Sequence, residues 1–310
     1  WEDDVRPALA EAHSAGRPCV LATLAKVEGS APRGPGAQML FDGPRASGYF
    51  SGDCIEGDVA RHAADVLADG VARKLHYGMG SPWIDIRLRC GGALHVFVER
   101  IEANCVAVAE LMAASRERRQ CRWSSDGMVQ AVEPGGGPLV SFSEAPLGLT
   151  RRYDPPRRVI VSGGDPGALA VARLASQARF ETILVRPGGP ETPPPFAGLT
   201  YLREDPAAAL SRLGLDRWTA YVGATHEDHH DLAACLAALR GGAGYVGMIG
   251  AKTRAEGRRA ALRAAGASED ELARLHLSPG IPGLGKAPWE VATGIMAEVM
   301  QALNPASERA

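Results

Sequence analysis

The segment "RVIVSGGDPGALAVARLA" (residues 158–175) decides the fold expected for the second half of the chain. A short run of β-branched residues leads directly into a glycine-rich turn, and the turn leads into an alanine- and leucine-rich stretch with helical spacing. This order of strand, turn and helix is typical of the first unit of a nucleotide-binding sheet. In such a unit, the backbone amides of the turn and of the helix N-terminus approach a phosphate group. The six positions of the pattern G-x-G-x-x-G fall on Ser162, Gly163, Gly164, Asp165, Pro166 and Gly167.

This turn departs from the usual dinucleotide pattern. Serine replaces the first glycine, and Asp165 puts a negative charge where phosphates would arrive. The acidic residue that holds the ribose hydroxyls, about 20 residues further on, is replaced by Arg186. An arginine at that position suits a 2′-phosphate, so NADP is favoured over NAD if a dinucleotide binds. The alternative is a sheet of the same fold that has lost its nucleotide.

The remainder of this half alternates strands and helices. Further strands are expected at 182–186, 199–203, 219–225 and 244–250, separated by alanine- and leucine-rich helices. That alternation predicts a Rossmann-like, doubly wound parallel sheet over residues 151–310. The stretch "PGGPETPPPF" (187–196) is predicted to be a surface loop. The segment 288–303 is predicted to be an amphipathic helix that begins at Pro288.

The first half of the chain has a different pattern. Short apolar runs broken by glycine predict strands at 18–30, 36–41, 46–51, 74–79, 83–88 and 93–100. Two runs with helical spacing, 54–74 and 102–119, predict helices. Residues 1–150 therefore read as an α+β domain. A proline pair among four arginines (149–158) is the expected linker to the second domain.

Composition limits the classes of partner. The chain has 310 residues and a formal net charge of -2, so no overall field draws it to nucleic acid or to an anionic membrane. We find no apolar run near the ~18 residues that a spanning helix needs, and the acidic, amphipathic start is unlike a signal peptide. Six scattered cysteines without a C-x-x-C pair favour a reducing cytoplasm.

Polar side chains follow two strands of the predicted parallel sheet. "THEDHHD" (225–231) stands at the carboxyl end of its strand, where ligands collect in such sheets. His226 and His230 invite a metal interpretation, but Asp228 is expected to cap the next helix, which would leave His226 outside it. A polar rim is therefore favoured over a metal site. In "GMIGAKTR" (247–254), Lys252 would point toward the same crevice, although an ordinary turn with a solvated helix start is the alternative.

The stretch "SGDCIEGD" (51–58) puts one thiol at the start of a predicted helix. Asp53 and Glu56 have the spacing of a capping box, with Asp53 as N-cap and Cys54 as first helical residue. The helix dipole would then favour a reactive thiolate, whereas the neighbouring carboxylates oppose it. A small buried hydrophobic role for Cys54 is the alternative.

Several motifs in order resemble the XdhC/CoxI family of xanthine dehydrogenase accessory proteins. The motifs are "EGSAPRGPGAQMLF" (28–41), "SGDCIEGDVA" (51–60), "CGGALHVFVE" (90–99), "GYVGMIGAKTR" (244–254) and "SPGIPGLGKAPWEVATGIMAEVM" (278–300). The resemblance runs from about residue 19 to residue 300. It implies an N-terminal XdhC-type domain, a C-terminal Rossmann domain and a cytoplasmic location. Family members bind the molybdenum cofactor and help deliver its sulfurated form to molybdenum hydroxylases.

The resemblance also assigns residues. The family's G-S-x-P-R falls on Gly29, Ser30, Pro32 and Arg33, and its G-G-C-[IV]-E falls on Gly52, Asp53, Cys54, Ile55 and Glu56. A molybdopterin carries a phosphate and a sulfur-ligated metal, so Arg33 and Cys54 are its expected contacts. The chain departs from the family at Asp53, where glycine is usual, and at Arg186, where aspartate is usual. Lys286 and Trp289 also stand where other residues are expected.

Three hypotheses follow from these residues. The first is an accessory protein that binds molybdenum cofactor and serves a molybdenum hydroxylase client. The second is an NAD(P)-dependent oxidoreductase that acts on a small molecule between the domains, with acid, base or nucleophile from Asp53, Cys54, Glu56 or His226. Its nucleotide contacts would be Ser162, Gly163, Gly164, Gly167, Arg186, Thr225, Gly250 and Lys252. The third is a scaffold protein without a ligand; a homodimer is the expected assembly.

Overall fold

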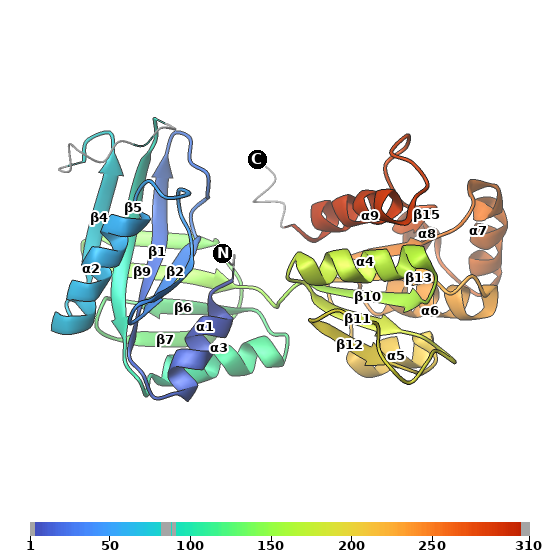
Figure 1. The fold of residues 1–310 in the computed structure, drawn as a ribbon, viewed down its shortest axis with the longest axis horizontal. Helices are drawn as coiled ribbons and strands as arrows, with labels where there is room; N and C mark the ends of the chain where they lie inside the picture. The colour runs from blue at the N-terminus through green and yellow to red at the C-terminus, as the bar shows by residue number, and fades with distance from the viewer. Residues whose placement is uncertain (1–3, 82–87, 89–90, 305–310) are drawn as a thin grey trace. The chain divides into compact units, whose positions relative to one another are not determined.

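The computed structural model describes residues 4–81, 88 and 91–304 (Figure 1). The chain divides into two compact units, Trp1–Pro155 and Pro156–Ala310. The linker is shorter than the sequence indicates, because strand β9 (Leu147–Tyr153) continues past residue 150 and strand β10 (Arg158–Gly163) begins directly after the prolines. The boundary predicted at 150/151 therefore falls inside β9.

The N-terminal unit contains a five-stranded antiparallel sheet with the order β3-β2-β1-β5-β4. Its strands are β1 (Cys19–Glu28), β2 (Gln38–Asp42), β3 (Arg45–Gly48), β4 (Arg73–Gly78) and β5 (Ala93–Ile101). Along β1, successive side chains enter two different cores, since Val20 packs with helix α2 (Glu56–Asp69) and Leu21 packs on the opposite face. The strand expected at 83–88 lies, apart from Leu88, outside the described residues.

Helix α2 buries the stripe predicted for it, because Val59, Ala63 and Val66 are all in the core. The predicted run to residue 74 was too long. The helix ends at Gly70, whose φ of 74° is the left-handed conformation that closes many helices, and Val71 beyond it is exposed.

A second antiparallel sheet, with the order β7-β6-β9-β8, had no counterpart in the sequence expectations. It consists of β6 (Cys121–Ser125), β7 (Gln130–Pro134), β8 (Val140–Glu144) and β9. Its strands carry serine, arginine and glutamate on their exposed faces, so they give a weak apolar signal. The buried ring of Trp123 joins this sheet to the core that also contains α1 (Arg6–Ser14) and α3 (Val106–Arg116).

A buried carboxyl group connects the two sheets. Glu99 of β5 is fully buried and accepts hydrogen bonds from Trp123 Nε1 (3.3 Å), from Gln130 Nε2 (2.8 Å) and from the Ser125 hydroxyl. Burial raises the pKa of Glu99 to about 6, despite these donors, which act in the opposite direction. The two antiparallel sheets and their helices agree with the predicted α+β class.

The C-terminal unit is a six-stranded parallel sheet with the order β12-β11-β10-β13-β14-β15. Numbered within the unit, this order is 3-2-1-4-5-6, the order of dinucleotide-binding Rossmann sheets. After β10 come β11 (Glu181–Val185), β12 (Leu199–Leu202), β13 (Thr219–Ala224), β14 (Tyr245–Met248) and β15 (Leu275–Leu277). The first five strands were predicted, and the three-residue β15 was not. The chain reverses direction across the sheet between β10 and β13, which is where ligands bind in this fold.

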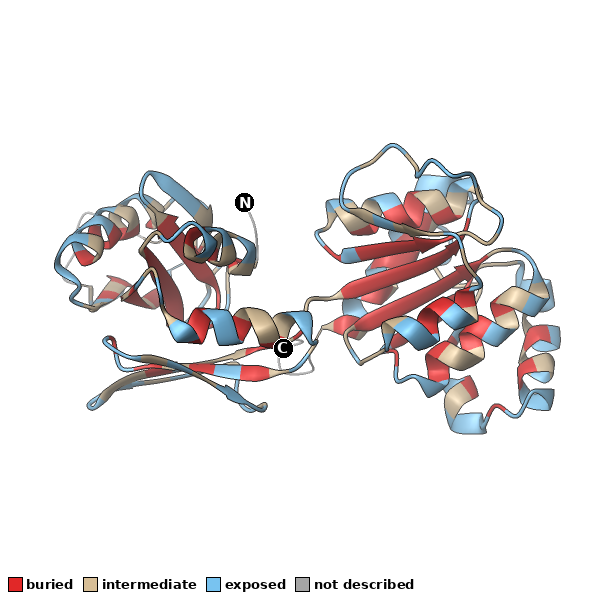
Figure 2. Ribbon diagram, turned by 90° about the horizontal axis from the view of Figure 1, so that it is seen from below, coloured by how far each residue is buried: buried red, intermediate tan, exposed pale blue. Residues whose placement is uncertain are grey.

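Helices cover both faces of this sheet, and its central strands are buried throughout (Figure 2). Helices α4 (Pro166–Gln177) and α9 (Pro288–Leu303) pack on one face, and α5 (Pro206–Leu213) and α6 (Asp228–Arg240) pack on the other. The short elements η1 (Lys252–Arg254), α7 (Ala255–Ala264) and α8 (Glu269–Ala273) follow β14. Burial on both faces explains why these strands read as continuous apolar runs.

Two further predictions are confirmed in this unit. Helix α9 has Pro288 at its first position and buries Ile295, Val299 and Leu303. Residues 187–196 form a loop without helix or strand. Among the described residues, no helix has the length and apolar character needed to cross a membrane.

Candidate functional site

The glycine turn after β10 has a conformation that glycine alone adopts readily. Gly163 has φ 133° and pairs with Ala224 of β13. A Cβ on Gly163 would lie 2.6 Å from the Ala224 carbonyl carbon, so any side chain would push the two strands apart. Ser162, in the position of the first glycine, is buried, and its hydroxyl bonds the Tyr221 hydroxyl at 2.7 Å. The Ser162 side chain therefore belongs to the core of the sheet.

Asp165 and His226 form a bridge over the point where the sheet reverses direction. Asp165 caps α4 by accepting a hydrogen bond from the Ala168 amide (2.6 Å), and its second oxygen lies 2.8 Å from His226 Nε2. Each of the two residues stands two positions beyond the paired Gly163 and Ala224. The protein's own carboxylate thus occupies the helix N-terminus where the phosphates of a dinucleotide were expected.

A buried aspartate shapes the loop that carries His226. Asp231 is fully buried and accepts hydrogen bonds from the Thr225 amide (3.1 Å), the Thr225 hydroxyl (2.8 Å) and the His226 amide (3.2 Å). His226 itself has φ 64°, a left-handed conformation that is unusual for histidine. The sequence indicated this loop but not its anchor.

The expected cap of α6 was wrong. Asp228 is the first residue of the helix and makes ion pairs with Arg254 (2.5 Å) and Arg258 (3.4 Å), while Glu227 is the N-cap residue without a capping side-chain bond. His226 precedes the helix, as predicted.

A pocket of about 160 Å³ opens at this carboxyl edge of the sheet. It is lined by residues that follow three neighbouring strands: Gly163, Gly164, Arg186, Pro187, Gly188, Gly189, Thr225, Glu227 and His230. The guanidinium group of Arg186 lies against Gly164, where a Cβ would be 2.6 Å from Arg186 Cζ. The absence of a side chain at Gly164 thus makes room for Arg186 at the turn.

The other expected nucleotide contacts do not line this pocket. Gly167 lies in the first turn of α4. Gly250 lies against the buried guanidinium of Arg258, whose Cζ would be 3.0 Å from a Cβ there, and Lys252 is exposed in η1.

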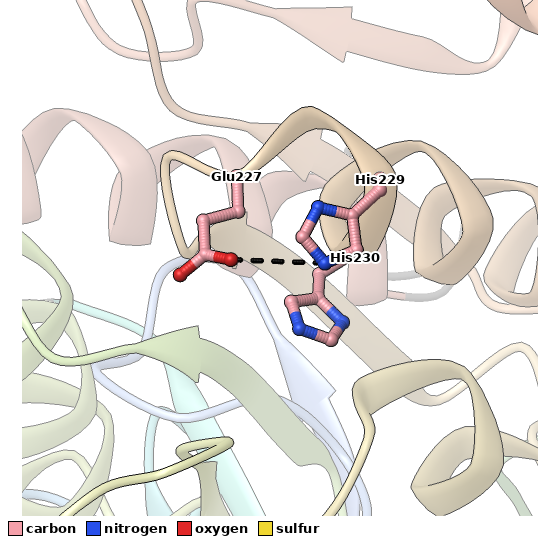
Figure 3. A group of neighbouring side chains, drawn as sticks. All are labelled: Glu227, His229 and His230. Atoms are coloured by element: carbon pink, nitrogen blue, oxygen red, sulfur yellow. Dashed lines mark ion pairs between the residues drawn. The ribbon is translucent and has the colours of Figure 1, made fainter.

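At the pocket rim, Glu227, His229 and His230 have potential ligand atoms within 4.8 Å of one another (Figure 3). His229 Nε2 lies 3.7 Å from the Glu227 carboxylate, and His230 Nδ1 lies 3.0 Å from Asp205 Oδ2. Glu227 and His229 are mostly exposed, so solvent-screened contacts hold them and no rigid coordination geometry is built in. His226, which the sequence paired with His230, bonds Asp165 instead.

The thiol segment is organised differently from the predicted capping box. Both carboxylate oxygens of Glu56 turn back onto the preceding loop and accept hydrogen bonds, between 2.6 and 3.2 Å, from the amides of Phe50, Ser51, Gly52, Asp53 and Ile55. The Ser51 hydroxyl donates to Glu56 (2.6 Å) and accepts from the Cys54 amide (2.9 Å). Helix α2 begins at Glu56, so Cys54 precedes it.

Charge and conformation in this loop follow from those bonds. Burial raises the pKa of Glu56, but the hydrogen bonds from Ser51 and the other donors outweigh it and lower the pKa to about 2. Asp53 is exposed and has φ 89°, directly after Gly52 at φ 79°. A left-handed conformation explains why glycine suits position 53, and aspartate tolerates it better than most residues do.

Cys54 is half-buried and packs against the core beneath α2. Arg33 reaches the end of the strand that leads into this loop, since its Nη1 donates to the Tyr49 hydroxyl at 3.0 Å and its guanidinium lies 4.7 Å from the ring centre. The structure therefore brings Arg33 to the segment that precedes Ser51. His226 belongs to the other unit.

Comparison with known proteins identifies the family. Residues 12–78 match the XdhC and CoxI family, and residues 159–299 match the XdhC Rossmann domain. The chain belongs to the XdhC/CoxI family. The XdhC relatives include the molybdenum cofactor insertion chaperone PaoD of Escherichia coli (strain K12), 27% identical over 96% of this chain and 88% of that protein. Another, named as a probable component of xanthine dehydrogenase in Bacillus subtilis (strain 168), is 25% identical over 91% of this chain and 92% of that protein.

The XdhC fold is also found in a solved structure. The crystal structure of a xanthine dehydrogenase from Bacillus halodurans matches with a TM-score of 0.76 and 21% identity, over 98% of this chain and 97% of that one. The resemblance inferred from the motifs is thus confirmed along nearly the whole chain. The XdhC-type and Rossmann domains correspond to the α+β unit and the parallel sheet described above.

Proposed function

We propose that this protein is an XdhC-type accessory protein that binds molybdenum cofactor as cargo and assists its sulfuration or insertion into a molybdenum hydroxylase. The observation that carries the proposal is its alignment, over 96% of its length, with a protein named as a molybdenum cofactor insertion chaperone. Similarity over both domains, rather than over the Rossmann sheet alone, favours a shared role.

The loop around Cys54 supports this role. The hydrogen bonds to Glu56 fix the backbone of residues 50–55, so the thiol is held in one position just before α2. A thiol is a ligand that soft metals and sulfur-rich centres accept. In this proposal Cys54 contacts the cofactor, Glu56 positions it, and Arg33 supplies a positive charge to an anionic cargo.

The test is the amount of pterin that the purified protein retains. The protein is purified from a host that makes molybdopterin, denatured, and the released small molecules are quantified by mass spectrometry. We expect near-stoichiometric pterin in the wild type, a loss of at least about tenfold in Cys54→Ser, and wild-type retention in the control Cys105→Ser, a half-buried cysteine of another cluster. Equal retention in Cys54→Ser and the wild type would overturn the proposed role of the thiol.

A second candidate is an NAD(P)-dependent oxidoreductase built on the same scaffold. The Rossmann strand order and the position of Arg186 beside Gly164 favour it, whereas the Asp165 carboxylate at the N-terminus of α4 opposes a diphosphate. Titration with NADPH and NADH decides between the candidates. Tight NADPH binding that Arg186→Asp shifts toward NADH would favour the enzyme. The predicted homodimer is a separate question, and sedimentation of the purified protein would answer it.

A further inference from the structure

The pocket at the carboxyl edge of the Rossmann sheet contains hydrogen-bond donors without acceptors. Within the described part of the chain, the amides of Gly164 and Gly188 and the guanidinium of Arg186 have no hydrogen-bond or ion-pair partner, although all three residues line the pocket. Arg186 is half-buried. Two backbone amides and a guanidinium around one small pocket are donors that match the three oxygens of a phosphate group.

Negative groups limit how much charge this pocket accepts. Glu227 contributes a carboxylate to the pocket, and the Asp165–His226 bridge lies over the adjoining ends of β10 and β13. A dinucleotide must place its diphosphate at the N-terminus of α4, where the Asp165 carboxylate already accepts the Ala168 amide. A ligand with one terminal phosphate avoids that position, and Glu227 can accept a hydrogen bond from a hydroxyl or amino group of the same ligand.

We infer that this pocket binds a phosphate monoester, with Arg186 as the anion-binding residue, and that Asp165 excludes dinucleotides. Only the identity of the natural ligand rests on the proposed function, because molybdopterin carries a phosphate. The pocket itself is tested without any pterin.

The experiment is calorimetric titration of the full chain with ribose 5-phosphate, with sodium sulfate at matched ionic strength and with NADPH. The wild type should bind ribose 5-phosphate more tightly than sulfate and should not bind NADPH. Arg186→Gln should weaken ribose 5-phosphate binding about 10- to 100-fold, since it removes charge-assisted hydrogen bonds. Arg212→Gln removes the same charge from an exposed ion pair in the same unit and should change binding by about twofold or less.

Asp165→Asn retains a capping side chain and removes the negative charge, so it should gain NADPH binding that the wild type lacks. Backbone amide NMR gives a second measurement: ribose 5-phosphate should shift the Gly164 and Gly188 resonances in the wild type and not in Arg186→Gln.

Three results would overturn the inference: equal affinity for sulfate and ribose 5-phosphate, unchanged affinity in Arg186→Gln, or tight NADPH binding by the wild type. Pterin retention is independent of each of them. Phosphate binding that fails while Cys54-dependent pterin retention persists would refute the pocket and leave the proposed function standing. The converse result would refute the proposed function and leave the pocket.

Discussion

Glu56 offers the sharpest test of how the thiol loop is built. Its carboxylate accepts hydrogen bonds from five backbone amides and the Ser51 hydroxyl, and three of these donors reach each oxygen. The substitution Glu56→Gln removes the charge and replaces one acceptor oxygen with an amino group. That group would face N–H donors, so at least two amides would lose their acceptor.

The expected cost follows from the pKa of Glu56. The difference between the ordinary value of 4.5 and the folded value of about 2 corresponds to about 3 kcal/mol at neutral pH. Because the side chain is only half-buried, solvent screening reduces this contribution to about 1.5 kcal/mol. The folded pKa is depressed, so the stabilisation is fully present above pH 4.5 and is lost as the pH falls from 4.5 toward 2.

The assay is urea unfolding of the wild type and Glu56→Gln at pH 7 and at several values down to pH 3. We expect a deficit of about 1.5 kcal/mol at pH 7 that narrows below pH 4.5, and faster alkylation of Cys54 in the variant, mapped by mass spectrometry. Glu110→Gln, an exposed glutamate on α3, is the matched control and should be neutral. Equal stability at pH 7, or a deficit that does not change with pH, would refute the reasoning.

Two further predictions concern the glycine turn and the buried carboxyl group. Gly163→Ala should destabilise the Rossmann unit by about 2–5 kcal/mol, because φ is 133° and the Cβ meets the Ala224 backbone, whereas Gly167→Ala, with open space around it, should be neutral or slightly stabilising; thermal unfolding compares them. Glu99 has a raised folded pKa, so its stabilisation is present below pH 4.5 and about 2 kcal/mol is lost as the pH rises through about 6. The stability difference between wild type and Glu99→Gln should follow that curve, and a difference that is flat between pH 4.5 and pH 7 would contradict it.

Much of the fold was predictable because its signals are local. The order of strand, glycine turn and helix at residues 158–175 predicted the parallel sheet, and Pro288 marked the first residue of α9. The small second sheet of the N-terminal unit was not predictable from periodicity, because its strands are short and half-exposed. Only pairing with β6 and β9 makes these segments strands.

The candidate site was predictable in its residue types but not in its contacts. The sequence identified Asp165, Arg186 and the residues after β13 as the polar rim of one sheet edge. It placed a capping box at Asp53, whereas Ser51 and Glu56 organise that loop. The error has a physical reason: Asp53 has a left-handed backbone, which an N-cap residue does not adopt, and the spacing of residue types cannot show this.

The sequence by itself determined the two-domain organisation, the parallel sheet and the family, because each depends on neighbours along the chain or on motifs in order. Only the tertiary structure decided that Asp165 bonds His226, 61 residues away, and that Arg186 occupies the space left by Gly164. These contacts bring together residues from three separate strand ends. Their energy depends on distances that arise when β10, β11 and β13 align in the folded sheet.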